Sequence, residues 1–98
     1  MIRYAPRARD QVRALRDHYE RRNRPEAIRT LDAALIEAEQ RIERNPGAGL
    51  PAPRPYPDLA RRGRAWIKAG RYWIAYSTVT PPVILAVFYE EADIPGRM

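Results

Sequence analysis

The spacing of apolar residues predicts two amphipathic helices in the first half of the chain. Ala8, Val12, Leu15 and Tyr19 recur at intervals of four, three and four residues, which places them on one face of a helix that begins near Pro6. Residues 21–24 interrupt this pattern, and a second helix restarts at residue 25, again with proline in its first turn. Its apolar stripe consists of Ile28, Leu31, Leu35, Ala38 and Ile42. Because residues 45–47 read Asn-Pro-Gly and end the second helix, we expect an antiparallel helical hairpin over residues 6–44.

The second half of the chain changes to the alternating pattern of strands. Residues 64–68, 71–78 and 83–89 are predicted strands, and residues 1–5 are a short edge strand that ends before a proline. The intervening residues 46–63 are rich in proline and glycine and predict an extended connection with a short turn at 57–60. The order β-α-α-β-β-β predicts an α+β fold, in which the helical hairpin packs on one face of a small antiparallel sheet. We expect residues 1–98 to form a single domain.

A two-residue turn at Ala69-Gly70 would set the register of the first hairpin, since glycine accepts a positive φ. This turn pairs Trp66 with Trp73 across the two strands. Ala65, Ile67, Tyr72, Ile74 and Tyr76 then share the face that packs on the helices, and Arg64, Trp66, Lys68, Arg71, Trp73 and Ser77 share the other. Two interpretations of the second face stay open. The connection 46–63 covers its tryptophans, or the tryptophans and cations form a binding surface.

The net charge of the chain indicates which kind of partner it can bind. The formal net charge is +6, and every cation except Lys68 is an arginine. Residues 54–71 hold six cations and one anion, so the positive excess gathers around the first hairpin. Such a balance favours an anionic partner, either a nucleic acid or an acidic protein segment.

Composition also excludes several kinds of site. The chain has no Cys and one His, which excludes disulfides, thiolate nucleophiles, Cys-built zinc sites and His-rich metal centres. His18 alone is no site, no pair of carboxylates is obliged to meet in a cleft, and no glycine-rich phosphate loop follows a strand. We expect no cofactor and no metal. No apolar run is long enough to span a membrane, and residues 1–6 lack the apolar stretch of a secretory signal, so we expect a cytoplasmic protein with no membrane partner.

The order and spacing of short motifs along almost the whole chain resemble the toxins of type II toxin–antitoxin systems in the RelE/ParE superfamily. The matching motifs are Pro6-Arg7-Ala8, Pro25-Glu26-Ala27, Asn45-Pro46-Gly47-Ala48-Gly49, Arg64, Gly70-Arg71-Tyr72 with Tyr76, residues 84–88, and Asp93-Ile94-Pro95. The resemblance implies one of two activities. One branch of the superfamily cleaves mRNA on the ribosome, and the other, ParE-like branch inhibits DNA gyrase by binding. An antitoxin whose C-terminal segment wraps around the toxin silences both.

The sequence departs from each branch at one place. The nuclease branch holds the scissile phosphate with an arginine at the position of Trp73. Chains of the ParE-like branch commonly read His-Gly-Arg where this chain reads Tyr89-Glu90-Glu91. The ending Asp93-Ile94-Pro95 is similar to that of the ParE-like branch.

The resemblance therefore implies a ParE-like toxin that inhibits DNA gyrase, forms a hetero-oligomer with a ParD-like antitoxin and has no catalytic residues. The residues expected to bind the antitoxin or the target are Arg64, Trp66, Lys68, Arg71, Trp73 and Tyr89. One alternative is a ribosome-dependent mRNA endonuclease that uses Arg64, Lys68, Arg71 and Tyr89. The other is a non-toxic member that still binds its antitoxin, which the acidic pair Glu90-Glu91 favours.

Overall fold

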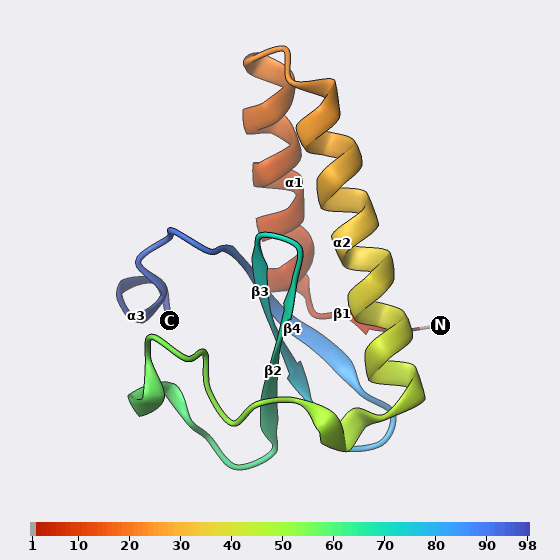
Figure 1. Ribbon diagram of the computed structural model, residues 1–98, viewed down its shortest axis with the longest axis vertical. Coiled ribbons are helices and arrows are strands. Elements are labelled where there is room, and N and C mark those ends of the chain that lie inside the picture. The colour runs from red at the N-terminus through yellow and green to blue at the C-terminus, as the bar shows by residue number, and fades with distance from the viewer. Residues whose placement is uncertain (1) are drawn as a thin grey trace.

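The computed structural model describes residues 2–98 and has the predicted order of helices and strands (Figure 1). Its helices and strands are β1 (Arg3–Tyr4), α1 (Pro6–Arg21), α2 (Pro25–Arg44), β2 (Arg64–Ala69), β3 (Tyr72–Ser77), β4 (Val83–Tyr89) and α3 (Ile94–Arg97). Two 3₁₀ turns, η1 (Pro46–Ala48) and η2 (Pro57–Leu59), lie in the connection between α2 and β2. The predicted α+β fold is confirmed. Met1, where the predicted edge strand began, lies outside the described residues.

Helices α1 and α2 both have proline in the first turn, as the sequence predicts. They form an antiparallel hairpin whose tip projects beyond the sheet (Figure 1). Arg16 of α1 and Asp32 of α2 form an ion pair between the two helices. Asn23 takes a positive φ of 54° in the turn between them, a conformation that asparagine tolerates better than most residues.

The sheet has the strand order β1-β4-β3-β2. The three longer strands pair antiparallel, as expected, whereas β1 pairs parallel with β4. The sheet is therefore mixed rather than fully antiparallel. The reason is topological: β1 joins the sheet beside the last strand, and the whole helical hairpin lies between them in the chain.

The register of the β2–β3 hairpin differs from the predicted one by two residues. Its loop is Gly70-Arg71, so Ala69 pairs with Tyr72 and Trp66 pairs with Ala75. Trp73 pairs with Lys68, and the expected Trp66–Trp73 pair is wrong. Gly70 takes its positive φ of 55° at the first loop position, whereas the prediction had put it at the second. Because a shift of two residues preserves the alternation of side chains, the predicted division into two faces is still correct.

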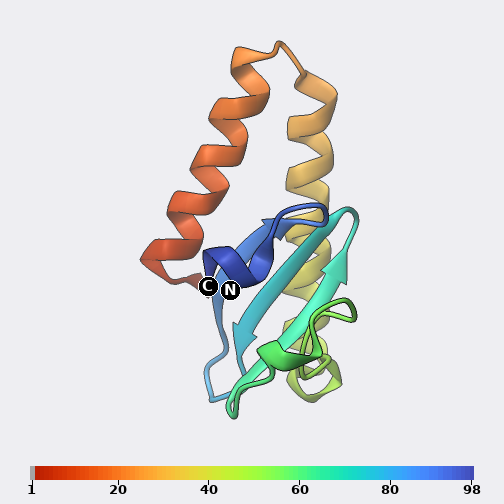
Figure 2. The same ribbon diagram turned by 90° about the vertical axis from the view of Figure 1, so that its left-hand side faces the viewer.

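One face of the sheet packs on the helices. The five residues predicted for this face are all buried there, together with Leu31, Ile42 and other apolar residues of α2. The opposite face carries a second buried cluster around Trp66, Trp73 and Phe88. Figures 1 and 2 show the helices on one side of the sheet and the connection between α2 and β2, with α3, on the other.

The connection between α2 and β2 covers the second face closely. Leu50 and Trp66 exchange two backbone hydrogen bonds of 2.7 Å, so Leu50 adds one residue of strand pairing beside β2. Leu50, Tyr56 and Leu59 pack against the second cluster. Of the two interpretations left open by the sequence, the structure confirms covered tryptophans: Trp66 is 0% and Trp73 4% exposed.

Candidate functional site

The six residues predicted to bind a partner do not form one surface. Trp66 and Trp73 belong to the buried second cluster. Lys68, Arg71 and Tyr89 lie near the β2–β3 loop. Arg64 lies at the opposite end of β2, about 13 Å from Lys68 along the strand. The cations therefore separate into two groups.

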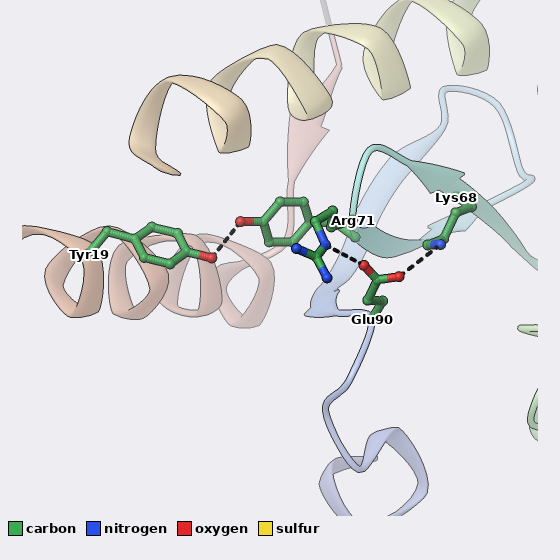
Figure 3. Close-up of polar contacts among 5 residues, drawn as sticks. Tyr19, Lys68, Arg71 and Glu90 are labelled. Atoms are coloured by element: carbon green, nitrogen blue, oxygen red, sulfur yellow. Dashed lines mark hydrogen bonds and ion pairs between the residues drawn. The ribbon is translucent and has the colours of Figure 1, made fainter. Parts of the chain in front are cut away.

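Glu90 joins the cations near the β2–β3 loop. Its Oε2 accepts a hydrogen bond of 2.6 Å from Nε of Arg71, and its Oε1 lies 3.4 Å from Nζ of Lys68 (Figure 3). The Glu90 N–H also donates to the Arg71 carbonyl at 2.8 Å. We call Lys68, Arg71, Tyr89 and Glu90 the turn cluster. Sequence reasoning assigned Glu90 no contact, because only the hairpin pairing brings it between two cations.

Charge pairing shifts the proton affinities within the turn cluster. The hydrogen bond from Arg71, with the nearby charge of Lys68, holds the pKa of Glu90 below its ordinary value. The same hydrogen bond raises the pKa of Arg71. Glu90 is therefore ionised at neutral pH and offsets part of the positive charge. The Arg71 side chain remains 62% exposed, so it is still accessible to a partner.

An aromatic ring packs against the exposed cation, and a second ring packs against the first. The Arg71 guanidinium lies 5.4 Å from the centre of the Tyr89 ring, and this ring meets Tyr72 edge-on at 5.8 Å. The Tyr72 and Tyr19 hydroxyls share a hydrogen bond of 2.6 Å, which ties the sheet to α1. Burial and this hydrogen bond raise the pKa of Tyr72. A groove of about 680 Å³ opens beside the cluster, lined by α1, the first turns of α2, the start of β3, the end of β4, and Arg97.

Trp73 lies under two cations. Nζ of Lys68 is 5.6 Å and Cζ of Arg54 5.9 Å from its ring. Since the indole is buried and apolar, it supplies hydrophobic contact and a surface for these cations. It cannot take the role of an arginine that holds a phosphate.

Within residues 2–98, no three His, Asp or Glu side chains gather as metal ligands. No helix in the same range is both long enough and apolar enough to cross a membrane.

Comparison with known protein families identifies residues 2–93 as the ParE toxin of type II toxin–antitoxin systems, parDE. Comparisons with curated proteins and with solved structures find no match. The family match implies an antitoxin partner, because a type II system pairs each toxin with an antitoxin. With a match over nearly its whole length and the α+β fold expected for the superfamily, this chain belongs to the ParE toxin family of type II toxin–antitoxin systems.

Proposed function

We propose that this protein inhibits DNA gyrase by binding to it, without a hydrolytic site of its own, and that a ParD-like antitoxin neutralises it in a hetero-oligomer. The observation that carries the proposal is the match to the ParE toxin family over residues 2–93. Expressed without its antitoxin, the protein would arrest growth.

The surroundings of the predicted nuclease residues support a binding function over RNA cleavage. Cleavage of a phosphodiester needs cations free to stabilise the developing charge, with a base and an acid beside them. Here Glu90 pairs with both Lys68 and Arg71, and Trp73 is buried at the position of the phosphate-holding arginine. Arg64 lies at the far end of β2. The four residues of the nuclease alternative thus do not converge on one phosphate.

The antitoxin segment expected for this toxin is amphipathic and acidic. Its carboxylates would reach the exposed donors of Arg71 and displace or share the contact with Glu90. Apolar side chains of the segment would offset the entropy lost when it folds on the toxin.

A supercoiling assay with purified protein tests the target. We expect micromolar toxin to stop gyrase from supercoiling a relaxed plasmid, and we expect prior incubation with the antitoxin encoded beside it to restore activity. Full supercoiling, combined with growth arrest on expression, would exclude gyrase as the target.

Two other outcomes point to the alternatives. Arrested translation with cuts at codon positions, lost in Lys68→Ala and Arg71→Ala, would indicate the ribosome-dependent endonuclease. Harmless expression without any antitoxin would indicate a member that only binds its antitoxin. The pairing of Glu90 with two cations is the structural observation that favours this last alternative.

A further inference from the structure

Two arginines from distant parts of the chain lie over rings on the face of the sheet away from the helices. Arg7 lies in the first turn of α1, and its Cζ is 6.0 Å from the centre of the Phe88 ring. Arg64 begins β2, and its Cζ is 5.4 Å from the Trp66 ring. The Phe88 and Trp66 rings stack at 6.2 Å with an interplanar angle of 25°. Both guanidinium groups therefore lie over one continuous pair of rings.

Arg61 adds a third charge beside this pair. Burial, together with the charges of Arg61 and Arg7, lowers the pKa of Arg64. The Arg64 N–H also donates to the Arg61 carbonyl at 3.3 Å, so Arg61 lies in the turn that leads into β2, directly before Arg64. We call Arg7, Arg61 and Arg64 the arginine cluster.

The charges of the arginine cluster are not neutralised. Within residues 2–98, none of its three members forms an ion pair with a carboxylate, in contrast to Lys68 and Arg71. Arg7 and Arg64 donate instead to the carbonyls of Arg97 and Leu59, which hold them in place but carry no full charge. Nε of Arg64 is buried and has no hydrogen-bond partner among the described residues.

Rings and carbonyls hold the guanidinium groups of Arg7 and Arg64 in place, as in a preorganised anion site. A guanidinium presents paired N–H donors that match the oxygens of a phosphate, and donors fixed in advance lose less entropy on binding. Arg7 and Arg61 are exposed, so a ligand can reach them. The first turn of α1 contains no acidic residue, which leaves the positive end of the helix dipole unopposed nearby.

We propose that the arginine cluster binds the phosphodiester backbone of a nucleic acid, independently of base sequence. The rings beneath the cluster are already buried, Trp66 at 0% and Phe88 at 3% exposure, so no base can stack on them. For the same reason the cluster offers little apolar contact to an acidic peptide, which needs such contact to fold on a surface. A phosphate backbone needs only the charges and the donors. The proposal goes beyond gyrase inhibition and does not depend on it.

Fluorescence anisotropy with a labelled DNA duplex of arbitrary sequence tests this site in the absence of gyrase. The test variant is Arg7→Gln with Arg61→Gln, which removes two exposed charges and leaves the partly buried Arg64 in place. The matched control is Arg21→Gln with Arg22→Gln, which removes the same charge from exposed positions at the tip of the helical hairpin. Circular dichroism checks that both variants keep the wild-type fold.

We expect the test variant to bind the duplex about tenfold more weakly than wild type, and the control to change affinity less than about twofold. The slope of log affinity against log salt should also fall by about two, one for each lost phosphate contact. Equal weakening by both variants would show that diffuse charge causes the binding and would overturn the site. Failure of the wild type to bind DNA at low salt would also overturn the site. So would polyglutamate that binds as tightly as DNA and loses as much affinity in the test variant.

Discussion

Glu90 sets the charge that the β2–β3 loop presents to a partner. One carboxylate contacts both Lys68 and Arg71, so two of the predicted binding cations are partly neutralised within the chain. Because Glu90 has a lower pKa in the folded chain than in the unfolded one, its ionised form favours folding. The stabilisation is present above the unfolded pKa and is lost as the pH falls through the folded pKa.

The variant Glu90→Gln should therefore be less stable than wild type at neutral pH, by a small amount because the pair is accessible to solvent. The difference should shrink as the pH falls below about 4.5 and vanish once Glu90 is protonated in the folded chain. Urea unfolding midpoints over this range measure it. The control Glu91→Gln removes an adjacent exposed carboxylate that forms no ion pair with a described residue. A difference that does not shrink as the pH falls would contradict the assignment.

The two tryptophans report on the cover of the second face. With exposures of 0% and 4%, their indoles should resist acrylamide quenching in the native chain and become accessible in urea. The variant Trp66→Phe isolates the signal of Trp73, and free tryptophan in the same buffer gives the unprotected reference. Native quenching as efficient as that of the unfolded chain would show that partners can reach the indoles.

At the level of elements, the connection between α2 and β2 acts as a packed layer. The Tyr76 hydroxyl donates to the Pro46 carbonyl at 2.6 Å, which ties the start of the connection to β3. Gly49 lies so close to the sheet that a Cβ there would stand 2.9 Å from the Cβ of Ala65 and would overlap the Tyr76 hydroxyl. Glycine is required here by close approach and not by its backbone angles, since the φ of Gly49 is −70°.

Gly49→Ala should accordingly push the connection away from the sheet and cost about 1–3 kcal/mol of unfolding free energy. Gly47→Ala is a matched control two residues away, because a Cβ at position 47 would meet only the Asn45 side chain at 3.6 Å. We expect the control to change stability by less than about 0.5 kcal/mol. Urea unfolding of both variants measures these costs, and equal effects would show that the connection is not held against the sheet.

Across the whole molecule, the sheet is the middle of three layers. The helical hairpin covers one face, and the connection with α3 covers the other (Figure 2). Because both faces are covered, the exposed cations lie beside or above packed side chains and not on a bare sheet face. The turn cluster lies near the β2–β3 loop, whereas Arg64 of the arginine cluster lies at the opposite end of β2 and Arg7 lies over Phe88.

The sequence by itself determined the helices, the strands and the two faces of the β2–β3 hairpin. These features follow from local periods and from residues such as Pro6, Pro25 and Gly70, whose backbone preferences act within a few positions. The same pattern could not identify which two residues form the loop of the hairpin, since glycine suits either position of a two-residue loop. The resemblance to the superfamily likewise rested on the order of local motifs.

Only the tertiary structure decided which side chains are available for binding. The burial of Trp66 depends on the path of a long connection, and the contact of Glu90 with Lys68 depends on the order of strands in the sheet. The meeting of Arg7 with Arg64 likewise needs α1 and β2 to converge on one stack of rings. Contacts between residues so far apart in the chain arise from packing, and no local spacing encodes them.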